Sequence, residues 1–171
     1  MQNQGLLETG TDEGVLQLVC FMFADEEYAV DITNVQEVIR IPKITHIPQM
    51  PDFTLGIINI RGNIIPVFDL RTKFGLHKKE ADDQSKIIVV NVNNSKICFL
   101  VDKILNNVKI TTSSVVPTPN VKMKIKRECI KGIGKFEDRM IIILDLLKLN
   151  EYILEDIKAL SGEAHSGDIL R

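Results

Sequence analysis

Short apolar runs, each followed by residues that favour turns, recur along this chain. Each run is five to eight residues long and rich in Val, Ile, Phe or Leu, which is typical of buried strands. Several such runs with Gly, Asn, Asp or Pro between them predict an all-β protein. The clearest runs are 16–23, 28–32, 55–60, 64–68, 86–92 and 96–101.

Four local signals predict the elements between these strands. Thr33-Asn34-Val35-Gln36 has the form of a capping box, which predicts a short helical segment over 35–39. The three prolines of 41–53 exclude a regular helix or a central strand and predict a long ordered loop. Asp69 and Asp145 are each followed by apolar residues at helix-like spacing, so both are predicted to be helix N-caps rather than catalytic groups.

The chain contains an internal repeat. Gly56–Leu70 aligns without a gap on Gly132–Leu146, and 28–32 aligns on 97–101 in the same order. The apolar positions coincide, but the turn reads Arg-Gly-Asn in the first copy and Glu-Asp-Arg in the second. A shared apolar pattern with different turns predicts two similar modules that present different binding faces.

The length and composition set the domain organisation. With 171 residues and 44% apolar residues, the chain has enough material for one domain or two small modules with a common interface. We expect a flexible N-terminal tail over 1–14 and a body over 15–150, whose halves meet near residues 81 and 82. A C-terminal helix over 151–161, with Ile153 and Ile157 on one face, and a tail over 162–171 are expected to follow.

Charge is unevenly distributed along the chain, although the formal net charge is only −2. No Lys or Arg precedes Arg40, whereas five basic residues fall within 122–131. That cluster keeps open an alternative function, a small β-barrel that binds nucleic acid, or another protein-interaction module. The absence of Trp, the presence of only 2 Tyr and an acidic pI argue against nucleic acid as a partner.

No constellation for chemistry is visible in the sequence. Cys20, Cys98 and Cys129 are widely spaced and contain no Cys-x-x-Cys pair, so we expect no metal site and no cofactor. No Ser or Cys nucleophile has a nearby His, and no glycine-rich phosphate loop occurs, so no catalytic residues are predicted. There is no signal peptide, and the longest apolar stretch is too short to insert directly into a membrane, so a cytoplasmic location is expected.

Two segments carry a resemblance to a known family. Gly56-Ile57-Ile58-Asn59-Ile60-Arg61-Gly62 and Ile64-Ile65-Pro66-Val67-Phe68-Asp69-Leu70-Arg71, with Val35–Ile39 upstream, resemble the CheW family of chemotaxis coupling proteins. The resemblance covers about 16–149. It implies two intertwined five-stranded Src-homology-3-like β-barrels with a groove between them, short helical turns and a C-terminal helix. It also implies a non-catalytic adaptor located at the inner face of the membrane through receptor arrays.

The same resemblance implies two partners and the residues that meet them. One partner is the cytoplasmic tip of a chemoreceptor, and the other is the regulatory domain of a CheA-type histidine kinase. From the residues alone, core and groove remain equally open for Val35, Ile104 and Val108. The implied receptor-binding residues are Val35, Glu37, Gly56, Asn59, Arg61, Gly62, Ile104 and Val108. The implied kinase-binding residues, within 121–130, are Val121, Ile125 and Ile130.

Overall fold

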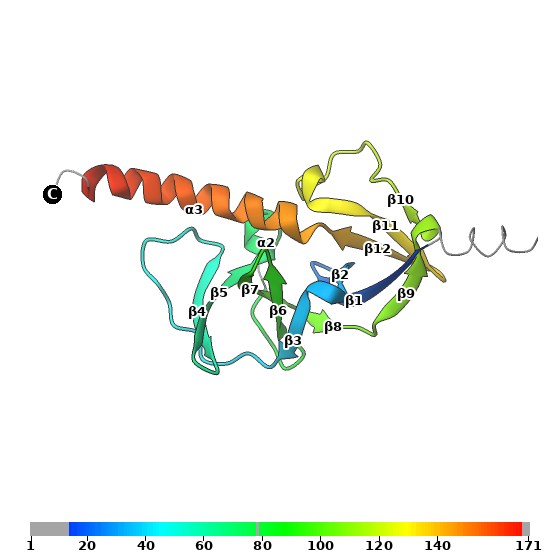
Figure 1. Cartoon of the computed structure of the whole chain (residues 1–171), viewed down its shortest axis with the longest axis horizontal. Helices are drawn as coiled ribbons and strands as arrows, with labels where there is room; N and C mark the ends of the chain where they lie inside the picture. Colours follow the sequence, from blue (N-terminus) through cyan, green and yellow to red (C-terminus); the bar gives the residue numbers. More distant parts are fainter. Residues whose placement is uncertain (1–13, 78, 169–171) are drawn as a thin grey trace, which may run out of the picture.

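A computed structural model describes residues 14–77 and 79–168, with side chains through residue 160 (Figure 1). The predicted N-terminal tail over 1–14 therefore lies, apart from Gly14, outside the described residues, as do residues 169–171 of the predicted C-terminal tail. The strands are β1 (Val15–Phe23), β2 (Glu26–Asp31), β3 (Val35–Ile39), β4 (Thr54–Ile60), β5 (Asn63–Asp69), β6 (Lys86–Val92), β7 (Ser95–Val101), β8 (Lys103–Ile104), β9 (Val108–Thr111), β10 (Val115–Val116), β11 (Ile130–Phe136) and β12 (Arg139–Leu144). The helices are α2 (Leu70–Lys73) and α3 (Leu146–Asp168), with 3-10 turns η1 (Ile32–Asn34), η2 (Thr112–Ser114) and η3 (Arg127–Cys129).

The described strands form two sheets, which confirms the all-β prediction. One sheet has seven strands in the order β10-β11-β12-β2-β1-β8, with β9 also paired to β1, and we call it the seven-stranded module. The other has the order β3-β6-β7-β5-β4, and we call it the five-stranded module. Two strands of the larger sheet, β8 and β10, are only two residues long. The two modules lie side by side, and α3 crosses one face of the five-stranded module (Figure 1).

The modules are intertwined because each copy of the repeat contributes one hairpin to the sheet that contains the β4–β5 or β11–β12 hairpin of the other copy. The hairpin β1–β2 of the first copy pairs in parallel with β12 of the second, and β6–β7 of the second pairs in parallel with β5 of the first. The registers are equivalent as well: Ala29 lies opposite Ile143, and Cys98 lies opposite Val67. These are the pairs that the sequence repeat equates, so the duplication seen in the sequence explains the topology.

The exchanged hairpins are buried on both faces, which is why their sequences are almost uninterrupted apolar runs. Alternate residues point into a small core within each module or into a larger core between the modules. We call the latter the inter-module core, and Phe23 and Tyr28 stack in it with ring centroids 3.9 Å apart. Its fully buried aromatic residues come from both copies of the repeat: Phe21, Phe23, Tyr28, Phe68 and Phe99.

The predicted helical segment over 35–39 is wrong. The polar residues before it form only the single turn η1, capped by the Asp31 side chain, which accepts a hydrogen bond from the Thr33 amide at 2.9 Å. Val35–Ile39 is a strand that pairs with β6. Its β-branched residues pack on that neighbour, so pairing outweighs the local capping signal.

The two predicted N-caps are confirmed, but the C-terminal helix is longer than expected. Asp69 accepts from the Arg71 amide at the start of α2, and Asp145 accepts at 3.1 Å from the Lys148 amide at the start of α3. Because Asp145 already starts the helix, α3 runs from Leu146 to Asp168 rather than over 151–161. Two residues of α3 itself, Leu149 and Ile153, are fully buried, and their burial anchors the first turns of the helix.

Candidate partner-binding surface

The turn between β4 and β5 has a geometry that presents a charged side chain. Arg61 and Gly62 have φ angles of 50° and 89°, both left-handed, as a two-residue hairpin turn requires. Gly62 adopts this conformation freely, whereas Arg61 does so at a cost of roughly 1–2 kcal/mol. The Asn59 Oδ1 atom offsets part of that cost by accepting a hydrogen bond from the Gly62 amide at 2.8 Å. Asn59 thus shapes the turn that carries Arg61.

Arg61 is held by a carboxylate from the opposite edge of the same sheet. Its Nη2 donates to Oε2 of Glu37 on β3, while β3 and β4 stand at the two ends of the strand order. The pair therefore bridges the edges of the curled five-stranded sheet. The hydrogen bond from Arg61 lowers the pKa of Glu37 below its ordinary value, so the carboxylate stays charged. The Arg61 side chain remains 68% exposed, which leaves its guanidinium available to a partner.

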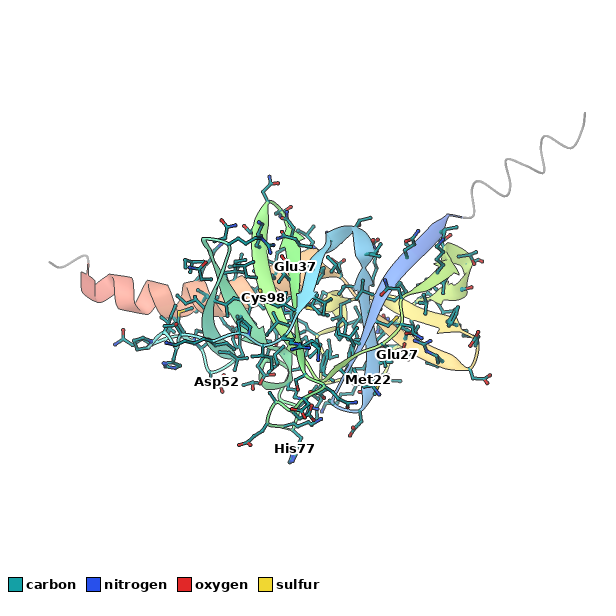
Figure 2. The ribbon with its side chains drawn as sticks, turned by 90° about the horizontal axis from the view of Figure 1, so that it is seen from below. Met22, Glu27, Glu37, Asp52, His77 and Cys98 are labelled. Atoms are coloured by element: carbon teal, nitrogen blue, oxygen red, sulfur yellow. The ribbon has the colours of Figure 1, made fainter. Side chains whose placement is uncertain are left out.

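The two modules each carry one such pair, but the pairs are not equivalent in the repeat. Arg139, at the start of β12, donates through Nε to Glu27 of β2 at 3.0 Å. Glu37 and Glu27 are labelled in Figure 2, where they lie on different modules. In the repeat, Arg139 corresponds to Asn63 rather than to Arg61. The modules consequently differ in where their exposed charge lies.

Gly56 is buried and serves the backbone rather than a partner directly. A Cβ at this position would lie 2.2 Å from the Thr45 carbonyl oxygen, and φ is 144°, so a side chain does not fit. Thr45 and Ile57 exchange two backbone hydrogen bonds of 2.9 Å here, which fasten the proline loop to β4. Any effect of Gly56 on binding would therefore act through the position of that loop and hairpin.

The three apolar candidates of the predicted groove fall into different environments. Val35 and Ile104 are partly buried and pack against the inter-module core from β3 and β8, where the two modules meet (Figure 1). Val108 is only 4% exposed and belongs to the core inside the seven-stranded module. In this structure Val108 is therefore a core residue, and it does not line a groove with Val35.

The candidate kinase-binding residues also differ in their exposure to solvent. Val121 is 62% exposed on the loop before η3, whereas Ile125 and Ile130 are buried in the inter-module core. A direct contact through this segment would thus rest on Val121 and its neighbours. The two isoleucines hold the loop in place.

The basic cluster over 122–131 is partly used inside the molecule. Arg127 donates to the carbonyl oxygens of Thr118 at 2.7 Å and Pro119 at 3.3 Å. The Lys126 ammonium lies 4.8 Å from the centre of the Tyr152 ring and within 4.0 Å of a Glu155 carboxylate oxygen. These two cations therefore stabilise the loop and its contact with α3, which argues against a patch built for nucleic acid.

The buried thiols do not form a reactive site. Burial raises the pKa of Cys20 and of Cys98 to about 12 and that of Cys129 to about 11, so all three are neutral thiols near pH 7. Among residues 14–77 and 79–168, no group of three or more His, Cys, Asp or Glu is placed to hold a metal ion. In the same part of the chain no helix is long and apolar enough to span a membrane.

Two intertwined β-modules with an exposed, internally braced arginine turn define a binding scaffold. Comparison with known proteins agrees with that class. The CheW-like domain family matches residues 17–152. The chain is 34% identical to a chemotaxis protein CheW from Helicobacter pylori, over 78% of this chain and 80% of that protein. It is 35% identical to a chemotaxis protein CheW from Thermotoga maritima, over 80% of this chain and 89% of that one.

A solved structure shows the same fold. The scaffolding protein TtCheW from Thermoanaerobacter tengcongensis superposes with a TM-score of 0.74 and 40% identity, over 78% of this chain and 91% of that one. The chain belongs to the CheW family, the non-catalytic coupling scaffolds of bacterial chemotaxis. The resemblance found in the sequence and the predicted scaffold function are thereby confirmed.

One pair of residues that the structure brings together was not predicted from the sequence. Arg71 and Asp102 form a bidentate ion pair where the modules meet. A signal was present, because the repeat diverges at this point: Asp69-Leu70 is followed by Arg71, but Asp145-Leu146 is followed by Leu147.

Proposed function

We propose that this chain links the cytoplasmic tip of a chemoreceptor to the regulatory domain of a CheA-type histidine kinase. It would do so in the cytoplasm, beneath the membrane, as part of receptor arrays. The observation that carries the receptor side is the Arg61 turn: an exposed guanidinium, fixed by Glu37 and presented by the Asn59–Gly62 hydrogen bond. An arginine held in one orientation binds a partner with less loss of conformational entropy.

The proposed receptor surface is smaller than the set of residues that the resemblance implied. Arg61, Gly62 and Asn59 are exposed, and Glu37, Val35 and Ile104 are partly exposed, so these six could contact a receptor helix. Gly56 and Val108 would contribute indirectly, through the loop and the core that support the surface. On the kinase side, the exposed Val121 is the best candidate of its segment.

A charge reversal tests the receptor surface. We expect Arg61→Glu to abolish capture by an immobilised receptor tip fragment, since it reverses the exposed charge and repels Glu37. Thermal unfolding should change little, because surface charges usually contribute less than about 1 kcal/mol. Lys135→Glu is the matched control: Lys135 is exposed and corresponds to Asn59 on the hairpin of the other module.

A charge swap separates recognition from folding. Glu37→Arg combined with Arg61→Glu keeps an ion pair across the sheet edges but exchanges the sign that a partner meets. Receptor binding should remain lost in the swapped protein, although its ion pair is restored and its unfolding temperature stays close to that of the unmodified protein. Recovery of binding in the swap would show that the pair matters only for folding, and normal binding by Arg61→Glu would refute the proposed surface.

A further inference from the structure

The exchange of hairpins creates two equivalent seams between the modules. In the first seam the β1–β2 turn lies against the segment that follows β5; this turn consists of Ala24 and Asp25. In the second the β6–β7 turn, Asn93 and Asn94, meets the segment that follows β12. Both are two-residue turns with left-handed backbones, and the repeat equates them residue by residue. Continuing the same alignment, Arg71 corresponds to Leu147 and Asp102 to Thr33.

The first seam is filled by an ion pair. Arg71 donates to both carboxylate oxygens of Asp102 and to the His77 carbonyl oxygen at 2.5 Å. Asp102 also accepts from the Ala24 amide at 3.2 Å, which fastens the turn. The Arg71 side chain is only 9% exposed. Hydrogen bonding to Asp102 raises the pKa of Arg71, and the negative charge of Asp69 adds to the effect.

The second seam is open. Leu147 stands in the place of Arg71 and Thr33 in the place of Asp102, so the ion pair of the first seam has no counterpart here, and Leu147 is 42% exposed. A cavity of about 390 Å³ lies here. Residues from five segments line it, among them Leu16, Asp31, Asn93, Lys131, Asp145 and Leu147.

Two carboxylates that would suit a cation, Asp31 and Asp145, line the cavity. Asp145 corresponds to Asp69 of the filled seam, and Asp31, which corresponds to Leu100 there, lines the same cavity. Each uses Oδ1 to cap a turn, Asp31 for the Thr33 amide and Asp145 for the Lys148 amide. Within the part of the chain that the structure describes, the Oδ2 atoms of both have no hydrogen-bond donor. Lys131 supplies the single positive charge among the lining residues.

We propose that the second seam binds an arginine side chain of a partner protein, which occupies in trans the place that Arg71 occupies in cis. The aliphatic stem would pack on Leu147 and Leu16, and the guanidinium would donate to Asp31 and Asp145. Arginine fits better than lysine because its planar fork can reach two carboxylates at once. This site is independent of the Arg61 surface and does not rest on the proposed receptor contact.

A small probe tests the pocket without knowledge of the partner. The probe is Nα-acetyl-arginine amide, titrated into isotope-labelled full-length protein and followed by two-dimensional amide NMR. We expect saturable shifts at Asn93, Asn94 and Leu147, with a Kd on the order of millimolar, as single-side-chain ligands allow. Nα-acetyl-citrulline amide has the same shape without the charge and should give no saturable shifts. Equal binding of both, or no saturation at these amides, would overturn the proposal.

Variants show whether the probe occupies the seam. Leu147→Arg with Thr33→Asp rebuilds the first seam in the second and should weaken probe binding at least about tenfold, that is ~1.4 kcal/mol. Leu154→Arg is the matched control, since it makes the same change one heptad further along α3, outside the cavity. Asp145→Asn keeps a good N-cap but removes one carboxylate, and it should also weaken binding. Equal weakening by Leu154→Arg would reject the site.

Discussion

At the residue scale, the ion pair between Arg71 and Asp102 supports the junction of the modules, because Asp102 also accepts a hydrogen bond from the Ala24 amide of the other module. Both side chains are largely removed from water, at 9% and 18% exposed. Truncating one member leaves the other as an unpaired charge, which costs about 3 kcal/mol at this burial. We therefore predict that Arg71→Met and Asp102→Ala each destabilise the protein by roughly that amount in urea unfolding.

The double variant distinguishes a coupled pair from two independent contacts. Arg71→Met with Asp102→Ala should cost clearly less than the sum of the single variants, because no unpaired charge remains. Simple additivity would contradict a direct ion pair. The same measurement on Arg61→Met with Glu37→Ala is a useful reference, since that pair is exposed and should give a coupling below about 1 kcal/mol.

At the element scale, α3 joins both modules through one aromatic ring. The Lys73 ammonium, from α2, lies 3.7 Å from the centre of the Tyr152 ring, and that of Lys126 lies 4.8 Å from it. Lys73 also pairs with Asp156 at 2.5 Å, and its side chain is 2% exposed. Two cations from different modules thus share one ring on the helix.

We predict that Tyr152→Ala lowers the free energy of unfolding by roughly 2 kcal/mol, since it removes both cation–π contacts and the packing of the ring. Tyr152→Phe keeps the ring and should be close to neutral, because no hydrogen bond of the Tyr152 hydroxyl is observed among the described residues. Urea unfolding measures both. A larger loss in the Phe variant than about 1 kcal/mol would show that the hydroxyl, not the ring, carries the contact.

The elements also show which features of this fold a sequence can reveal. The strands of the exchanged hairpins were predictable because burial on both faces leaves a run such as 18–23 without polar residues. The segment 35–39 was mispredicted because its pairing with β6 lies far away in sequence and outweighs a local cap. Arg71 and Asp102 are 31 positions apart, so their contact could not be predicted from local spacing in the sequence. Val108 stands between the polar Asn107 and Lys109, a pattern that fits either core or groove, and only the packing decides between them.

At the scale of the whole molecule, coupling requires two binding faces on one rigid body. The exchanged hairpins, the inter-module core and the Arg71–Asp102 pair all resist rotation of one module against the other. A partner held on one face is thereby kept at a fixed position relative to a partner on the other, which raises their effective concentration without any chemistry.

The last prediction follows from this rigidity. The purified protein should neither bind nor hydrolyse ATP, but it should raise the autophosphorylation of a CheA-type kinase when a receptor tip assembly is also present. Arg61→Glu should remove that stimulation while kinase binding persists, because only the proposed receptor face has changed. The effect is measured as the transfer of radiolabelled phosphate from ATP to the kinase. Kinase alone and kinase plus receptor are the references. Stimulation that survives Arg61→Glu would place the receptor contact elsewhere, and nucleotide turnover by the isolated protein would contradict a scaffold that acts by geometry alone.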